Sequence, residues 1–502
     1  MSPQKPDTTG RDSPIVRQLA NQAFSRASGA PLREHNHVRL LQDAAENYPA
    51  WLDAIHGARR TIHFEMYIIH EDDQGRLFAD ALMARAREGV RVRLLYDWMG
   101  GCGKTSRRFW RRLRDGGVEV RCYNPPRLDS PLGWTSRDHR KMIAIDGAVA
   151  FVTGLCVGQA WVGDPSRGLA PWRDTGLELR GPAVADCEQA FADAWAAAGP
   201  PLPPEPTLSN AGTDAGSDAA LPIAGDVAVR VVATVPYTAG LFRLDQLVAA
   251  LARHTLWLTD AYFAGTTPYV QALRAAAADG VDVRLLVPGA SDIPIVRLFS
   301  RAGYRPLLEA GVRVYEWNGP MLHAKTAVAD ARWARVGSTN LNIASWMGNR
   351  ELDAIVENGP FAQQMQAMFL ADLESATEVV LDARNRVRAP GPRPGAGAHA
   401  ASPKGSPSSA SGLPRAAPRG SSGRALAGAV RIGNTVSAAI TNRRVLEPVE
   451  AHIALISGGL LLALAALAVK FPRGLAYPLA LVVAWIGATL LYRGIRLHTK
   501  HD

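Results

Sequence analysis

Cysteine is scarce in this chain of 502 residues, and the four that are present have no regular spacing. They are Cys102, Cys122, Cys156 and Cys187, and none belongs to a CxxC pair or to a Cys/His group with the spacing of metal ligands. This argues against a disulfide framework and against a zinc site. We therefore expect no cofactor, no metal and a reducing compartment such as the cytoplasm.

Long apolar runs are also missing until the last 52 residues, and the polar N-terminus lacks the apolar core of a signal peptide. Residues 452–469 and 475–492 are two uncharged stretches of 18 residues, separated by a turn that contains Pro and Gly. Each is near the lower length limit for crossing a bilayer, so they predict a transmembrane helical hairpin. Basic residues outside the pair place the lobes in the cytoplasm. The alternative is a buried helical pair in a soluble domain.

The overall composition, with 47% hydrophobic and 20% charged residues, is that of a globular protein. The net charge of +10 and the isoelectric point near 9.6 favour anionic partners. Charge alone does not choose between an acidic lipid surface and nucleic acid, and clusters of arginine are also common on solvated faces.

Composition divides the chain into segments. We predict a flexible N-terminus (1–35), a first α/β lobe (36–198), a linker rich in Pro, Gly and Ser (199–226), a second α/β lobe (227–385), a disordered basic tether (386–445) and two transmembrane helices with a basic tail (446–502). The two lobes repeat each other. Residues 61–68, 89–95 and 117–120 parallel 255–262, 280–286 and 311–314 as buried strands, with helical stretches between them.

The pattern His-x-Lys-x-x-x-x-Asp occurs once in each repeat. The first copy holds His139, Lys141 and Asp146, and the second holds His323, Lys325 and Asp330. Each copy leads into a short turn, and the aligned turns place Cys156 where the second copy has Asn340. Two matching copies predict one active site assembled from both lobes within one chain.

This pattern suits a tetrahedral phosphate. In a strand, the His and the Lys of each copy point to the same face. The two ammonium groups supply charge, and turn groups such as Ser338 and Asn340 donate hydrogen bonds. Of two imidazoles, one can attack phosphorus while the other protonates the leaving oxygen and then activates the incoming hydroxyl.

Both copies resemble the HxKxxxxD motif of the phospholipase D superfamily, from about residue 40 to 370, most like bacterial cardiolipin synthases. The resemblance implies two α/β lobes with a pseudo-two-fold axis, a phosphohistidine intermediate and transfer of a phosphatidyl group. By this resemblance His139 is the nucleophile and His323 the acid and base, although the sequence alone does not order them. Asp146 and Asp330 orient the motif. Glu351 resembles the downstream carboxylate that orients an imidazole, with Asp174 as its weaker counterpart in the first half.

Two features depart from the family's pattern. Cys156 replaces the usual Asn, which removes an amide donor from the first half-site. The predicted membrane segments are C-terminal, whereas this branch usually carries them at the N-terminus.

The sequence therefore predicts a phosphatidyltransferase in the bacterial inner membrane. It would join two molecules of the anionic phospholipid phosphatidylglycerol into cardiolipin and release glycerol, and no nucleic-acid partner is expected. The alternatives are a phosphodiesterase that hydrolyses phospholipid or nucleic acid, and a non-catalytic lipid-binding membrane protein. If one histidine must be neutral and the other protonated, the rate should be bell-shaped in pH.

Overall fold

The computed structural model describes residues 14–127, 135–203, 223–293, 300–381 and 443–445, and isolated positions between 462 and 487. In this described part, sixteen strands form one sheet in the order β16-β15-β11-β10-β9-β12-β13-β14-β8-β1-β7-β6-β5-β2-β3-β4. The strands of the first half are β1 (Arg33–Gln42), β2 (Thr61–Met66), β3 (Arg91–Asp97), β4 (Glu119–Tyr123), β5 (Lys141–Ile145), β6 (Val149–Thr153) and β7 (Thr175–Arg180). Those that follow are β8 (Val227–Thr234), β9 (Thr255–Thr259), β10 (Asp282–Pro288), β11 (Arg313–Trp317), β12 (Thr326–Ala329), β13 (Trp333–Gly337), β14 (Glu351–Glu357), β15 (Ala376–Val380) and β16 (Arg443–Val445).

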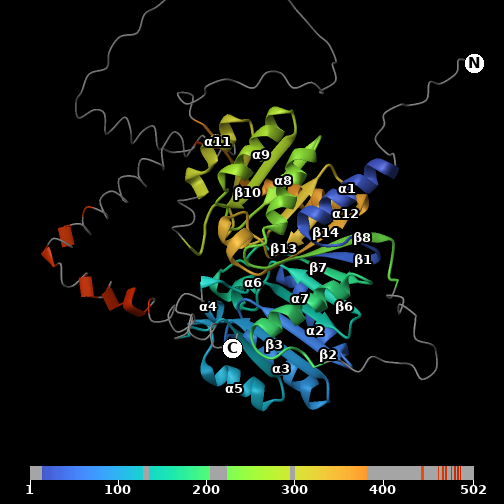
Figure 1. Ribbon diagram of the computed structural model, residues 1–502, viewed down its shortest axis with the longest axis vertical. Helices are drawn as coiled ribbons and strands as arrows, with labels where there is room; N and C mark the ends of the chain where they lie inside the picture. The colour runs from blue at the N-terminus through green and yellow to red at the C-terminus, as the bar shows by residue number, and fades with distance from the viewer. Residues whose placement is uncertain are drawn as a thin grey trace, which may run out of the picture.

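The sheet is symmetric about its central antiparallel pair, β1 and β8. Outward from this pair the order is β7, β6, β5, β2, β3, β4 on one side and β14, β13, β12, β9, β10, β11 on the other. These six strands on each side match one for one, β15 and β16 extend the second side beyond β11, and Figure 1 shows the two sides as two stacked lobes. The prediction of two similar α/β lobes is therefore confirmed.

Helices cover both faces of the sheet. The first lobe carries α2 (Asp43–Gly57), α3 (Asp73–Arg87), α4 (Trp98–Gly101), α5 (Arg107–Asp115), α6 (Gln159–Val162), the short η2 (Pro165–Arg167) and α7 (Val184–Ala197). The second carries α8 (Gly240–Leu251), α9 (Thr267–Ala278), α11 (Tyr304–Glu309), η3 (Ala344–Gly348) and α12 (Gly359–Glu374). Helices α7 and α12 share one hydrophobic core that runs across both lobes. The opposite face has a separate core in each lobe, under α2, α3 and α5 and under α8, α9 and α11.

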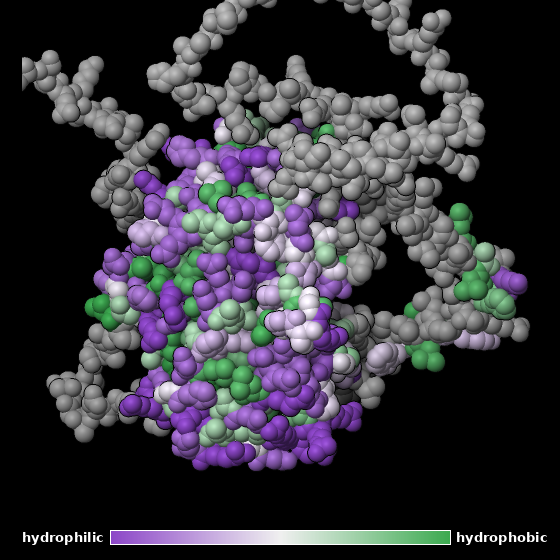
Figure 2. All heavy atoms as spheres, turned by 180° about the vertical axis from the view of Figure 1, so that it is seen from behind, coloured by the Kyte–Doolittle hydropathy of each residue, from purple (hydrophilic) through white to green (hydrophobic). Residues whose placement is uncertain are grey.

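On the face seen from behind in Figure 2, hydrophobic side chains form separate patches among hydrophilic ones. The strands that carry the two motifs lie inside: all residues of β5 and of β12 are buried. Burial on both faces explains why these strands are apolar runs without alternation.

The registers of β5 and β12 position the two histidines. Lys141 begins β5 opposite Met66, the last residue of β2, and Thr326 begins β12 opposite Thr259, the last residue of β9. Each histidine lies a few residues before its strand, His139 ahead of Lys141 and His323 ahead of Thr326. It therefore lies at the carboxyl end of the parallel strands, the edge at which open α/β sheets bind ligands.

The N-terminal segment differs from our prediction. Residues 14–28 of the range expected to be flexible form helix α1 (Pro14–Ser28), which packs against α8. Phe24 packs on the core of the second lobe, and Arg230 donates to the carbonyl of Ala30 at 2.6 Å. These contacts join segments some 200 residues apart, so local composition does not reveal them.

Other predicted segments fall largely outside the described residues. This holds for 204–222 of the linker and for the tether, of which only Arg443–Val445 is described, as strand β16 beside β15. It also holds for most of the predicted hairpin. Among the residues that are described, no helix combines the length and the apolar character needed to span a bilayer.

Candidate active site

Short backbone bridges between the lobes bring the two motifs together. The amide of His139 donates to the carbonyl of Arg350 at 2.9 Å, and the amide of Arg350 donates to the carbonyl of Arg137 at 2.8 Å. The second motif repeats this arrangement. The amide of His323 donates to the carbonyl of Arg173 at 2.7 Å. Each histidine is thus attached to a segment of the opposite lobe.

Each imidazole also takes its carboxylate from the opposite lobe. His139 Nδ1 lies 2.9 Å from Oε2 of Glu351, at the start of β14 in the second lobe. His323 Nδ1 lies 2.7 Å from Oδ2 of Asp174, which immediately precedes β7 in the first lobe. The structure therefore brings together all four residues that the sequence singled out. With Nδ1 beside a carboxylate, Nε2 is the nitrogen through which each ring can react with a substrate.

The two carboxylates are themselves held by different partners. Ser338 Oγ donates to Glu351 at 2.6 Å, and Asn349 Nδ2 donates at 3.2 Å. Asp174 accepts from the indole nitrogen of Trp161 at 3.0 Å and from the amide of Thr175 at 2.8 Å. Ser338 is therefore a direct hydrogen-bond partner of Glu351.

The two lysines lie beside their histidines. Lys141 Nζ donates to the carbonyl of His139, and Lys325 Nζ donates to the carbonyl of His323. Lys325 Nζ also lies 3.0 Å from Nε2 of His323. Burial lowers the pKa of Lys325 to about 8, against the opposing charge of Asp174. Burial also lowers the pKa of Lys141.

The electrostatics of the two histidines differ. Burial, followed by the charges of Lys141 and Lys325, holds the pKa of His139 well below its usual range. Burial and Lys325 lower the pKa of His323 to about 4, but Asp174 opposes this shift. Although burial works against it, the pKa of Asp174 lies below its usual value because His323 and Lys325 stabilise the carboxylate. Burial raises the pKa of Glu351. His323 is thus the imidazole with the stronger counter-charge.

The two motif aspartates lie at the far ends of their strands. The Asp146 carboxylate accepts from the amides of residues 59–61, each at 2.8 Å. The Asp330 carboxylate accepts from the amides of residues 253–255 at 2.7 to 2.9 Å. Both aspartates join the starts of β2 and β9 to the turns after β5 and β12. They hold the scaffold and do not contact the imidazoles.

The turns after the motifs show the asymmetry that Cys156 introduced. Cys156 is buried, and burial raises the pKa of its thiol. Asn340 is also buried, and its Oδ1 has no hydrogen-bond partner. Gly154 stands where the second turn has Ser338, and a Cβ there would lie 2.2 Å from Asp174 Oδ1. A serine like Ser338 therefore has no room beside Asp174.

Aromatic rings and a buried arginine complete the site, and sequence reasoning missed their roles. The ring of Tyr67 lies 4.7 Å from that of His139, and the ring of Tyr262 lies 5.8 Å from that of His323. Arg140 donates to the carbonyls of Glu351 and Thr234 in the second lobe. The only feature of the sequence that could have indicated the two tyrosines is their position, because Tyr67 follows β2 and Tyr262 follows the matching strand β9.

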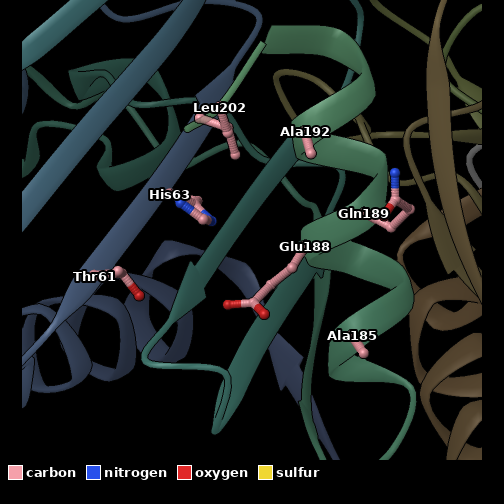
Figure 3. A pocket seen from close by; sticks show the side chains of 7 residues that line it. All are labelled: Thr61, His63, Ala185, Glu188, Gln189, Ala192 and Leu202. Carbon is pink, nitrogen blue, oxygen red and sulfur yellow. The ribbon is translucent and has the colours of Figure 1, made fainter. Parts of the chain in front are cut away.

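A separate pocket of about 370 Å³ lies on the α7 face of the first lobe (Figure 3). Its lining includes His63 on β2 and Glu188 on α7, and none of the motif residues. Burial lowers the pKa of His63 to about 4. Within the described ranges, no group of three or more His, Cys, Asp or Glu side chains is arranged to hold a metal ion.

The geometry supports chemistry on a phosphate diester. Two imidazoles at one lobe junction, each oriented by a buried carboxylate, provide a nucleophile and an acid. Two buried ammonium groups beside them provide the charge that a phosphate needs.

Comparisons with known proteins identify the family of the chain. The family described as "Cardiolipin synthase, PLD-like domain" matches residues 51–157 and 248–373. A protein of Alkalihalophilus pseudofirmus named cardiolipin synthase is 33% identical over 355 residues, 70% of this chain and 68% of that protein. Cardiolipin synthase A of Pseudomonas aeruginosa is 34% identical over 374 residues, 73% of each chain.

A solved structure shares the fold. The phosphatidylserine synthase of Haemophilus influenzae superposes with a TM-score of 0.56 at 14% identity, over 72% of this chain and 92% of that one. At this identity the likeness concerns the fold alone. The matches to the family and to its members establish that the chain belongs to the cardiolipin synthase family of phospholipase D-like proteins.

Proposed function

We propose that this protein is a phosphatidyltransferase that forms cardiolipin from two phosphatidylglycerol molecules and releases glycerol. The observation that carries the proposal is the crossed pairing of His139 with Glu351 and of His323 with Asp174. One site with two oriented imidazoles can both form and resolve a covalent phosphoryl intermediate. Membership of the cardiolipin synthase family supports the choice of substrate.

His139 is the proposed nucleophile. Attack on phosphorus requires a neutral imidazole, and the low pKa of His139 keeps this ring neutral across the physiological range. Glu351 accepts at Nδ1 and so directs Nε2 at the phosphate. The P–N bond forms as the bond from phosphorus to the glycerol oxygen breaks.

His323 is the proposed acid and base. The Asp174 carboxylate stabilises the charged imidazole of His323, and an anionic phosphate in the site adds to this stabilisation. His323 gives a proton to the departing glycerol oxygen and later takes one from the incoming hydroxyl. Lys141, Lys325 and the amide of Asn340 are proposed to hold the phosphate oxygens.

Attachment to a bilayer is part of the proposal. The linker (199–226) connects the two lobes (36–198 and 227–385). The tether (386–445) would connect the second lobe to the hairpin predicted for 446–502, which would anchor the protein in the bilayer. The basic flanks of the hairpin favour lobes on the cytoplasmic side of a bacterial inner membrane. The net charge of +10 suits an anionic lipid surface.

The test uses purified full-length protein in vesicles that contain phosphatidylglycerol. We expect cardiolipin and glycerol as products from the wild type and neither from His139→Ala or His323→Ala. Absence of any phosphatidyl product from the wild type would overturn the proposal. Phosphatidic acid without cardiolipin would identify a hydrolase. Trapping of a phosphorylated histidine would exclude a lipid-binding protein without catalysis.

A further inference from the structure

The surroundings of the two catalytic imidazoles differ in aromatic content. Three rings lie close to that of His323: Trp161 at 5.5 Å, Trp172 at 5.8 Å and Tyr262 at 5.8 Å. In the part of the chain that the structure describes, the ring of His139 has one such neighbour, Tyr67. The second imidazole therefore has an aromatic wall that the first lacks.

The first lobe supplies the two tryptophans of this wall through a longer segment between the turn and the carboxylate. That segment runs from Cys156 to Asp174, whereas its counterpart runs only from Asn340 to Glu351. The extra residues fold back on themselves, because the amide of Asp164 donates to the carbonyl of Leu169 at 2.7 Å and the amide of Leu169 returns a bond at 2.9 Å.

Gly163 makes the fold-back possible. Its φ of +74° lies in the left-handed region, and a Cβ there would lie 2.6 Å from the carbonyl oxygen of Leu169. The chain then returns to α6, where the amide of Trp172 donates to the carbonyl of Ala160 at 3.1 Å. This return places the Trp172 ring 4.8 Å from that of Trp161.

The two tryptophans, Trp161 and Trp172, differ in burial. Trp161 is buried, and its indole nitrogen is committed to Asp174. Trp172 is only half-buried. The next residue, Arg173, is fixed by two bonds to Asp372, at 2.8 and 3.0 Å. Trp172 is thus a partly exposed ring that is held at 5.8 Å from the ring of His323.

The second lobe uses its tryptophan in another way. Trp346, in the shorter segment, is fully buried in the core of that lobe and donates to Asp245 at 3.2 Å. It makes no wall for His139. The two tryptophans beside His323 are therefore a property of the longer first-lobe segment and not a consequence of the repeat.

We propose that Trp172 is a specificity-determining residue that favours an alcohol over water as the acceptor at His323. This inference rests on the proposed function, because it concerns the second half of that reaction. The C–H faces of a glycerol headgroup can pack on an indole ring, and water cannot. The apolar wall also reduces the number of water molecules near Nε2 of His323.

The step that Trp172 would bias is the resolution of the intermediate. The acceptor oxygen bonds to phosphorus, the P–N bond to His139 breaks, and the proton of the acceptor passes to His323. A lipid glycerol as acceptor yields cardiolipin, whereas water yields phosphatidic acid. Both outcomes start from one intermediate, so their ratio reports the acceptor alone.

The experiment compares wild type, Trp172→Ala and Trp172→Phe as full-length proteins in phosphatidylglycerol vesicles made up in ¹⁸O-labelled water. Mass spectrometry measures the ratio of labelled phosphatidic acid to cardiolipin. We expect Trp172→Ala to raise this ratio about fivefold, the scale of one lost aromatic contact. Trp172→Phe keeps a ring and should stay close to the wild type. The ratio does not depend on the amount of folded enzyme.

Trp317→Ala is the matched control, since Trp317 is another half-buried tryptophan, on β11, without a ring contact to either histidine. An unchanged ratio in Trp172→Ala, or an equal rise in Trp317→Ala, would overturn the inference. If the wild type forms cardiolipin in that experiment, the proposed function stands even when the inference fails. If the wild type forms no phosphatidyl product, the proposed function fails first.

Discussion

At the scale of single residues, the site depends on buried charges that compensate one another. His139, His323, Lys141 and Lys325 are all buried and all basic. Burial lowers the pKa of all four groups, and repulsion from neighbouring lysines lowers the pKa of His139, His323 and Lys325 further. Glu351 and Asp174 limit this effect. Before an anion binds, the site therefore favours neutral imidazoles beside the two lysines, and a bound phosphate shifts His323 toward its charged form.

Lys325 should set the alkaline limit of activity. Its pKa is lowered to about 8, so its charge is present below that pH and is lost as the pH rises through it. Because the phosphate needs this charge, we expect kcat/KM to fall above about pH 8. A guanidinium stays charged, so Lys325→Arg should move this limb upward, even with a lower maximum. Exposed Lys104→Arg serves as the control, and a limb that stays in place in Lys325→Arg would contradict the assignment.

Asp174 should be essential for the action of His323. Asp174→Asn keeps the shape of the side chain but removes the charge that stabilises the protonated imidazole. We expect kcat to fall at least about 100-fold with little change in stability. Steady-state kinetics on phosphatidylglycerol vesicles measures this. Asp193→Asn, on the exposed face of α7, should leave kcat unchanged. A loss of less than a few-fold in Asp174→Asn would show that His323 works without this partner.

At the scale of elements, the motif aspartates are turn residues and not reactants. Asp146 has φ +57° and Asp330 has φ +50°, in the left-handed region that Asp and Asn tolerate better than Ala. Each carboxylate binds three consecutive amides at the start of the neighbouring strand. The spacing of the motif thus places a reactive histidine before a strand and a structural aspartate after the same strand.

Asp146→Ala should therefore destabilise the fold without removing the chemistry. We expect the free energy of unfolding to fall by about 2 kcal/mol, because three amides lose a charged acceptor and alanine is strained at this φ. Urea unfolding measures this loss, and kcat per folded molecule should remain within a few-fold of the wild type. Asp146→Asn, which tolerates the turn, should lose less stability. A loss of kcat at unchanged stability would instead place Asp146 in the reaction.

At the scale of the whole molecule, one continuous sheet makes the two half-sites into one site. The β1–β8 pair joins the lobes, and the core under α7 and α12 crosses the junction. Arg140 adds bonds from the first lobe to β8 and to Glu351 of the second. These contacts hold each carboxylate against the imidazole of the other lobe.

Mixing two inactive full-length variants tests this arrangement. In a mixture of His139→Ala with His323→Ala, every chain lacks one imidazole. We expect no activity beyond the sum of the two residual rates, because each carboxylate serves a histidine of its own chain. The same assay on a mixture of wild type and His139→Ala gives the activity of the intact chains as a control. Recovery of a sizeable fraction of that activity would mean that chains exchange lobes.

The amino-acid sequence by itself determined the two α/β lobes and the residues that meet at their junction. Periodicity revealed β2 and β9 because buried strands must be apolar, and the duplicated motif marked His139 and His323 because the same chemistry needs the same side chains twice. Only the tertiary structure decided that Glu351 serves His139 and Asp174 serves His323, and that Trp172 lies beside His323. These contacts join residues that are far apart in the chain. Hydrophobic periodicity reports local structure only, so a single sequence does not show which residues meet across a lobe junction.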